Sequence, residues 1–437
     1  MIPLPHPAGP APRWLISAPF WGLSLLLVPW AWSLPDRVAG GFFLADSPLN
    51  DQEISQLLLS EAVWSGQEAL PGTWVEEATI AGAQLEHLMA QPKVFGQKAL
   101  FVQALERDEQ LSRLTITYAD AGTHFGYLTR RSGESTQDLR QRVLQEQKIF
   151  AESYAESLSQ LQEHLKELAG RPGRQERLGR SSLLDAEPRD FRLGELTVRL
   201  LNGQDRLLRV QIERQDALSR SWLEPDRAAL SASSLATFYR EQTHQDALGD
   251  LVIQGVPVIP QGSKPYCGLN TLAMVARYFG LNLDEDYLAV AGGFLNTGSS
   301  AGSNMPRLYQ AVAREAGLRC QRQLGFDAAR AQDSLSRGLP VIVWRYFSEE
   351  RNRFHSRHAR AHQEDPSLRM APPDSAERET YPTKAGGAPL HASVLIGFQA
   401  ATREYIFLES WSSSSEPRRM REEELSATNY VTFYFSS

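Results

Sequence analysis

The chain has 437 residues, which is long for one domain and predicts two domains with a shorter extension. Its formal net charge of −7 is mild, and no run of basic residues alternates with aromatic ones, so nucleic-acid binding is not expected. No Gly-x-x-x-x-Gly-Lys-Ser/Thr loop occurs, so we expect no nucleotide partner either.

Residues 1–33 are typical of a signal peptide. A mostly apolar stretch follows Arg13, and Ala31-Trp32-Ser33 has small residues at the two positions that signal peptidase recognises. Pro19 and Pro29 disfavour a stable helix across a membrane. We therefore expect cleavage after Ser33 and export to the periplasm or the extracellular space. An uncleaved segment that tethers the chain to a membrane is the alternative.

Residues 34–250 are predicted to form an α+β region. The first half of this region has two helical patterns, followed by two strands of alternating polarity joined by a charged turn. We expect helices at about 51–64 and 80–89, and a hairpin of strands at 98–104 and 114–118.

A long amphipathic helix is predicted from Glu134 to Ala169, with Gly170 as its stop. Its apolar residues recur at alternating spacings of four and three, at Tyr154, Leu158, Leu161, Leu165 and Leu168. Such a stripe suits a partner helix or a helix packed on its own domain, and we expect the second.

A second hairpin is predicted at 195–201 and 206–213 around Asn202-Gly203, a strong turn signal. One more helix is expected at 225–242. No cysteine, histidine and carboxylate gather at fixed spacing before residue 245. We therefore interpret 34–250 as an α+β accessory domain or a pro-domain, without chemistry of its own.

The second predicted domain, 251–437, begins with a cysteine at a helix start. Gln261 lies six residues before Cys267, and Gly268 and an apolar helical run follow. Free N–H groups and the partial positive charge at a helix N-terminus favour a thiolate over a thiol. The side-chain amide of Gln261 is a candidate donor to an oxyanion, so the pattern indicates a nucleophile beside an oxyanion hole.

The chain has one other cysteine, Cys320, and an exported protein can join two cysteines in a disulfide. The residues around Cys320 carry no other feature of a site. We expect Cys320 to be a small core residue on a short strand, with a bridge to Cys267 as the alternative.

His391 and Glu409 complete the candidate site. His391 begins the apolar segment 391–398, which predicts a buried strand. A second strand at 405–408 leads into Glu409-Ser410-Trp411. Antiparallel neighbours bring the start of one strand beside the end of the next. His391 is therefore the expected general base and acid, and Glu409 is the residue expected to orient it.

The motifs Gln261…Tyr266-Cys267-Gly268 and His391-Ala-Ser-Val-Leu-Ile-Gly resemble the C39-like branch of the papain-like cysteine peptidases. The resemblance covers about 252–437. It implies a papain-like fold, in which a helical lobe carries the cysteine and an antiparallel sheet carries the histidine. It also implies Gln261 as oxyanion-hole donor, Cys267 as nucleophile and His391 as general base and acid.

One departure from the family pattern concerns Glu409, because the family has Asp or Asn there. Glutamate is one methylene longer, so it must bend or the strand must shift. Ser410 or a water molecule is the alternative orienting group. A catalytically impaired peptide-binding protein on the same fold is an alternative function, and Glu409 is its main support.

The remaining elements of the second domain are predicted as helices at 305–316 and 327–337 and strands at 339–346 and 429–435. An insertion at about 347–390 contains His355, His358 and His362 among many arginines. We interpret it as a solvated basic loop without a metal site, placed before His391 as a lid or as part of the substrate subsites.

The sequence thus predicts an exported cysteine peptidase that hydrolyses peptide bonds through an acyl-thioester, with a peptide or protein as substrate and no cofactor. A transpeptidase or amidase that uses the same acyl-enzyme remains an alternative.

Overall fold

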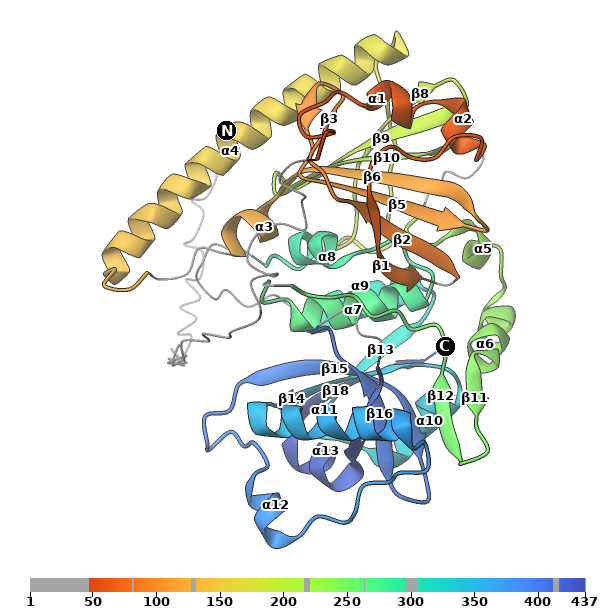
Figure 1. Ribbon diagram of the computed structural model, residues 1–437, viewed down its shortest axis with the longest axis vertical. Coiled ribbons are helices and arrows are strands. Elements are labelled where there is room, and N and C mark those ends of the chain that lie inside the picture. Colours follow the sequence, from red (N-terminus) through yellow and green to blue (C-terminus); the bar gives the residue numbers. More distant parts are fainter. Residues whose placement is uncertain are drawn as a thin grey trace, which may run out of the picture. The chain divides into compact units, whose positions relative to one another are not determined.

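The computed structural model describes residues 47–80, 82–126, 131–215, 221–262, 264–294, 305–411 and 416–436. The predicted signal peptide at 1–33 lies outside these ranges. Within them, no helix is both long enough and apolar enough to cross a membrane. The described chain forms an α+β structure built on two antiparallel sheets (Figure 1).

The first sheet has the strand order β1-β2-β5-β6-β10-β9-β8-β7, and all of its pairs are antiparallel. Its strands are β1 (Trp74–Ile80), β2 (Ala83–Leu88), β5 (Phe101–Arg107), β6 (Gln110–Asp120), β7 (Arg174–Gln175), β8 (Arg189–Leu193), β9 (Leu196–Gly203) and β10 (Leu207–Arg214). Beside it lie the short pair β3 (Lys93–Val94) and β4 (Gln97–Lys98), and the helices α1 (Ser55–Leu58), α2 (Glu61–Trp64), α3 (Ala121–Gly126) and α4 (Thr136–Ala169).

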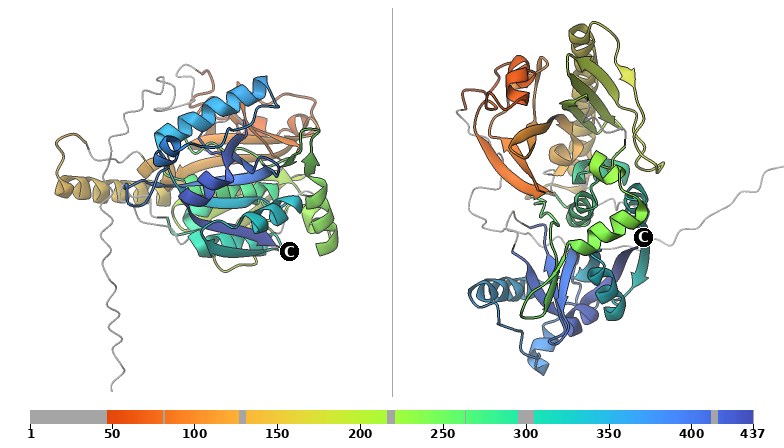
Figure 2. Two further views of the ribbon diagram at one scale, coloured as in Figure 1. Left: turned by 90° about the horizontal axis from the view of Figure 1, so that it is seen from below. Right: turned by 90° about the vertical axis from the view of Figure 1, so that its right-hand side faces the viewer.

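The long helix α4 confirms the predicted amphipathic pattern. Ser135 and Asp138 form a capping box at its start, and Gly170 ends it in the left-handed conformation. Tyr154, Leu161 and Leu165 are buried in the core of the first sheet. The helix therefore packs on its own part of the chain, while its N-terminal turns extend past the sheet (Figure 2).

Three local predictions in this part are wrong. The segment 80–89 is not a helix, because Gly82 turns the chain and Ala83–Leu88 pairs with β1 on one side and β5 on the other. The predicted helix at 51–64 is divided into α1 and α2, because Ser60 has an extended backbone. The turn of the second hairpin lies at Gln204-Asp205, both with positive φ, rather than at Asn202-Gly203.

The second sheet has the order β11-β12-β15-β14-β18-β13, with β16 paired to β15 and β17 paired to β16. Its strands are β11 (Thr243–Gln245), β12 (Asp250–Ile253), β13 (Arg319–Leu324), β14 (Val341–Tyr346), β15 (Leu390–Gln399), β16 (Glu404–Leu408), β17 (Arg418–Arg421) and β18 (Asn429–Ser436). These strands include the predicted ones at 339–346, 391–398, 405–408 and 429–435. Strands β11 and β12, which precede residue 254, belong to the same sheet.

The remaining helices are α5 (Pro225–Ala228), α6 (Ala232–Glu241), α7 (Cys267–Tyr278), α8 (Glu285–Ala291), α9 (Met305–Glu315), α10 (Ala328–Ser336), α11 (Glu349–Glu364), α12 (Ser375–Glu379) and α13 (Glu422–Thr428). Helices α7 and α9 lie between the two sheets (Figure 1). The predicted helix at 225–242 is interrupted, because Ser231 caps a new helix, α6.

The insertion at 347–390 is not a solvated loop, because residues 349–364 form helix α11. Arg351 and His355, one turn apart, point to the same side of this helix and both bind the buried Glu424 of α13. The helix packs against β17. Local charge density therefore misled the prediction, because a buried carboxylate from a distant segment satisfies these basic side chains.

One apolar core joins the two sheets. It contains Leu184, Leu207 and Trp222 from the N-terminal half together with α7, α8 and the inner strands of the second sheet. Hydrogen bonds also join the two parts, for example from the Asn282 main-chain N–H to Trp222 O at 2.6 Å. Within the described ranges, the residues before 250 and the residues after it thus share one core.

Candidate active site

Helix α7 begins at Cys267, as predicted, and packs against β15. Gly268 is needed at the second position, because a Cβ there would overlap the ring of Trp344 on β14. The same end of the helix is held by Tyr309, which donates a hydrogen bond to Gly268 O at 3.0 Å. These contacts hold the first turn of α7, which begins with Cys267, against the second sheet.

Cys267 and His391 lie close enough for each to shift the pKa of the other. Burial by itself raises the pKa of the Cys267 thiol, but His391 and the main-chain N–H groups of Ala392 and Gly268 lower it below its ordinary value. Burial by itself lowers the pKa of His391, but Glu409 and Cys267 raise it to about 9. Both shifts favour a thiolate beside an imidazolium.

Glu409 holds the other side of the imidazole. His391 Nε2 lies 2.6 Å from Glu409 Oε2, so Nδ1 is the ring nitrogen left for the sulfur. The indole of Trp411 is stacked on the imidazole, with ring centroids 4.2 Å apart and an interplanar angle of 12°. The hydrogen bond to Glu409 therefore restricts rotation of the imidazole in its own plane, and the stacked indole of Trp411 restricts tilting of the ring out of that plane.

Glu409 is an ionised carboxylate despite being only 6% exposed. Burial by itself raises its pKa, but His391 and Arg345 lower it to about 2. Arg345 Nη2 donates to Glu409 Oε1 at 2.7 Å, and Ser393 Oγ donates to the same oxygen at 3.0 Å. Each carboxylate oxygen thus has a partner, and the longer side chain reaches His391 without losing its own hydrogen bonds.

Strand register explains why these donors converge. Arg345 on β14 lies directly opposite His391 on β15, so their side chains share one face of the sheet. Ser393 is two residues beyond His391 and points to the same side. The sequence reasoning did not identify Arg345 or Ser393. The available signal was a charged residue inside the apolar strand 341–346.

Gln261 lies beside Ser410, the residue after Glu409. The Gln261 main-chain N–H donates to Ser410 O at 2.8 Å, and Ser410 Oγ donates to Gln261 Oε1 at 3.0 Å. Because the amide oxygen is held in this way, the amide N–H groups face away from Ser410. Gln261 Nε2 lies 3.4 Å from Lys264 O, within the loop that leads to Cys267.

Cys320 lies on β13, as predicted, and both cysteines are free thiols. Burial raises the pKa of Cys320 to about 12. Cys267 therefore forms no disulfide with Cys320. Because its thiol stays protonated at neutral pH, Cys320 can serve as an unreactive reference thiol in labelling experiments.

The histidines of the insertion have other roles. His355 binds Glu424, and His362 contacts Leu368 O and Arg419. Among the residues that the structure describes, no group of three or more His, Cys, Asp or Glu side chains is placed to hold a metal ion.

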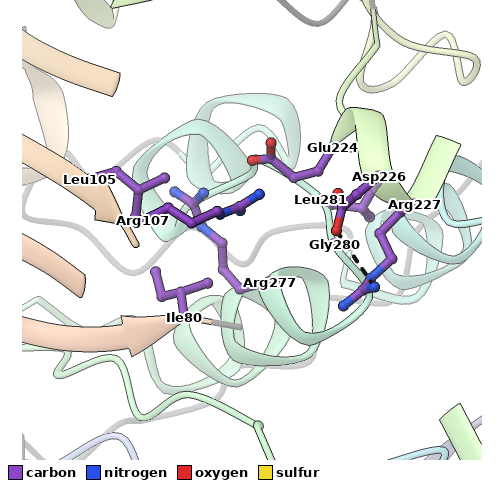
Figure 3. Close-up of a pocket in the computed structure, with 9 residues that line it drawn as sticks. All are labelled: Ile80, Leu105, Arg107, Glu224, Asp226, Arg227, Arg277, Gly280 and Leu281. Carbon is purple, nitrogen blue, oxygen red and sulfur yellow. Dashed lines mark ion pairs between the residues drawn. The ribbon is translucent and has the colours of Figure 1, made fainter. Parts of the chain in front are cut away.

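A pocket with an empty volume of about 360 Å³ lies at the other end of α7 (Figure 3). Arg107, Arg277 and Glu224 converge in it, and Gly280 and Leu281 line it just after the helix ends. At 1.5 Å rise per residue, α7 separates this pocket from Cys267 by roughly 17 Å. The pocket is therefore distinct from the Cys267–His391 pair.

Comparisons with known proteins bear on the C-terminal part of the chain. The model of the Peptidase_C39 like family matches residues 253–437. A crystal structure described as a C39-like peptidase from Bacillus anthracis is 17% identical, covers 42% of this chain and 96% of its own, and has a TM-score of 0.29. Comparison with curated proteins finds no match. The match over residues 253–437 supports a peptidase-type function for this part of the chain.

Proposed function

We propose that this protein is a cysteine peptidase that hydrolyses peptide bonds through an acyl-thioester. The observation that carries the proposal is the chain of contacts from Cys267 through His391 to the ionised Glu409. A thiolate, a protonated imidazole and a carboxylate that orients it are the groups that nucleophilic acyl transfer requires.

In the first half of the reaction, Cys267 Sγ attacks the carbonyl carbon of the substrate. The resulting oxyanion is held by the Cys267 main-chain N–H, which has no intrahelical acceptor at the first position of α7, and by the Gln261 amide. His391 transfers its proton to the leaving amine as the C–N bond breaks, and the acyl group stays on sulfur as a thioester.

In the second half, neutral His391 takes a proton from a water molecule, which attacks the thioester. The C–S bond breaks, the sulfur leaves as thiolate, and the acid product departs. Product analysis with an added amine acceptor separates this hydrolysis from acyl transfer to an amine.

Alkylation of Cys267 tests the thiolate directly. Because the pKa of Cys267 is lowered, iodoacetamide should modify it about tenfold faster than free cysteine at pH 7. Peptide hydrolysis should decline above about pH 9, where His391 loses the proton that it gives to the leaving group. Hydrolysis rates measured between pH 5 and pH 10 test this decline.

Cys320 is the internal control of this experiment, because burial raises the pKa of its thiol to about 12. Labelling should therefore stop at one equivalent per chain, and Cys320→Ala should leave the rate unchanged. Modification of Cys267 no faster than that of free cysteine would contradict the proposal.

We further propose that the chain is exported, which the apolar segment after Arg13 and the residues Ala31-Trp32-Ser33 support. The mature protein should begin at Leu34, and N-terminal sequencing of protein from the producing cells measures this. An intact N-terminus in a membrane fraction would favour the uncleaved anchor instead.

A further inference from the structure

The loop between Gln261 and Cys267 is tied to the first sheet by Lys264. The Lys264 ammonium lies 2.9 Å from Asp120 Oδ2 and 2.6 Å from Asp286 Oδ1. Asp120 is the last residue of β6, in the first sheet, and Asp286 lies in α8. Only 17% of the Lys264 side chain and 3% of the Asp120 side chain are exposed, so this ion pair is shielded from water.

Asp120 is itself held in place. Its carboxylate accepts hydrogen bonds from the main-chain N–H groups of Gly122 and Thr123, both at 2.9 Å, at the start of α3. Burial by itself raises the pKa of Asp120, but the Lys264 ammonium and the Thr123 hydroxyl lower it below its ordinary value. Asp120 is therefore a charged and fixed point to which the loop is attached.

A second contact holds the same loop from the same side. Tyr266, which directly precedes Cys267, is buried, and its hydroxyl lies against Gly122 so closely that a Cβ on Gly122 would overlap it. Asp120 and Gly122 thus touch the loop at Lys264 and at Tyr266. Both contacts come from the N-terminal half of the chain.

The main chain of Lys264 is hydrogen bonded to Gln261, so the position of Lys264 affects that of Gln261. The Lys264 N–H donates to Gln261 O at 3.1 Å, and the Gln261 side-chain amide is 3.4 Å from Lys264 O. A shift of Lys264 would therefore move the amide of Gln261 relative to the Cys267 N–H.

We propose that Asp120 and Gly122 are positioning residues that hold the two oxyanion donors in register, so that the N-terminal half is a working part of the enzyme. The inference rests on the proposed function, because it assigns Gln261 and the Cys267 N–H to the oxyanion. It also decides between the two readings of 34–250: a segment that positions the donors is not a pro-region to be removed.

The test compares two reactions of the same thiol in the full-length chain. Peptide hydrolysis uses the oxyanion donors, whereas alkylation by iodoacetamide requires only the thiolate. In Asp120→Asn, kcat should fall between tenfold and a hundredfold with KM nearly unchanged, because small displacements of catalytic groups have effects of this order. The alkylation rate of Cys267 should stay within about twofold of the unmodified protein.

A second variant covers the case in which Asp120→Asn does not fold. Gly122→Ala displaces the Tyr266 ring without removing a charge, and it should show the same separation of hydrolysis from alkylation. Asp190→Asn is the matched control: Asp190 accepts two hydrogen bonds from Arg199 at 2.8 Å within the first sheet, away from the loop. It should lower stability and leave kcat unchanged.

Unchanged kcat in folded Asp120→Asn and Gly122→Ala would overturn the inference and leave the proposed function intact. An equal loss of hydrolysis and alkylation would also overturn it, because the effect would then lie on the thiolate. If the unmodified protein shows no hydrolysis that depends on Cys267, the proposed function itself fails, which is a separate and recognisable outcome.

Discussion

Replacing Cys267 with alanine should abolish peptide hydrolysis, with a fall in kcat at least on the order of 10⁴-fold. The acyl-thioester cannot form without the sulfur, and the oxyanion donors that remain give only residual catalysis. The side chain that replaces the thiol is smaller and apolar, and it sits at a helix start between Tyr266 and Gly268. We therefore expect the fold to persist, as near-ultraviolet circular dichroism and urea unfolding would show.

The matched control is Cys320→Ala, which removes the other thiol of the chain. Cys320 lies on β13 and pairs with Phe435 of β18, apart from the His391–Glu409 pair. Turnover in Cys320→Ala should equal that of the unmodified protein. Turnover that survives in Cys267→Ala would show that another residue is the nucleophile, and the proposed mechanism would have to be abandoned.

Replacing Arg345 with methionine should destabilise the fold by up to about 3–5 kcal/mol, because it removes one of the two cationic partners of the buried Glu409 carboxylate. The guanidinium is 2.7 Å from Glu409, and both side chains are 3% exposed. Methionine approximates the length of the aliphatic part of arginine, so the lost charge dominates over lost volume. The free energy of unfolding in urea, measured at pH 7, gives the size of the effect.

The double variant Arg345→Met with Glu409→Gln separates charge from packing. Removing both charges together should restore most of the stability that either single change loses, because no buried charge is then left unpaired. Activity should not return in the double variant, since His391 keeps a neutral neighbour and its pKa falls from about 9 toward or below its ordinary value. A single-variant loss under about 1 kcal/mol, or strictly additive losses, would contradict a coupled buried pair.

The lowered pKa of Glu409 also makes the free energy of unfolding depend on pH. The carboxyl has a pKa of about 2 in the folded chain, below its ordinary value, so its stabilising contribution is present at neutral pH. That contribution is lost as the pH falls below the ordinary range of glutamate and through about 2. His391 behaves in the opposite sense, and its contribution is lost as the pH rises through about 9.

The candidate site was accessible from sequence because its parts carry local signals. Cys267 stands at the start of an apolar helix, and His391 at the start of an apolar strand. Glu409 follows the neighbouring strand in the order that an antiparallel pair requires. Each of these signals needs only a few consecutive residues, so no knowledge of distant contacts is required.

The partners of these residues could not be found in the same way. Arg345 meets Glu409 only because β14 and β15 pair in the register that sets Arg345 opposite His391, across an insertion of more than forty residues. The same applies to Lys264 and Asp120, which are 144 positions apart. Such contacts depend on strand pairing and on packing between the two sheets, which local propensities do not contain.

The errors have the same origin. Residues 83–88 have a helical pattern and form a strand, because β1 and β5 offer pairing on both sides. Residues 349–364 have the composition of a solvated loop and form a helix, because Arg351 and His355 both bind the buried Glu424. In both cases a tertiary contact outweighed the local preference.

The amino-acid sequence by itself thus identified Cys267, His391 and Glu409 as candidate site residues, and the order in which a helix and two strands present them. The sequence predicts apolar periodicity, the start of a helix and the ends of two strands, because each of these depends only on residues that are close together in the chain. Tertiary structure alone decided that His391 and Arg345 together lower the pKa of Glu409, and that Asp120 of the first sheet contacts the loop before Cys267. Both depend on charges that the fold brings together from distant positions and shields from water, where charged neighbours strongly shift a pKa and hold a side chain in place.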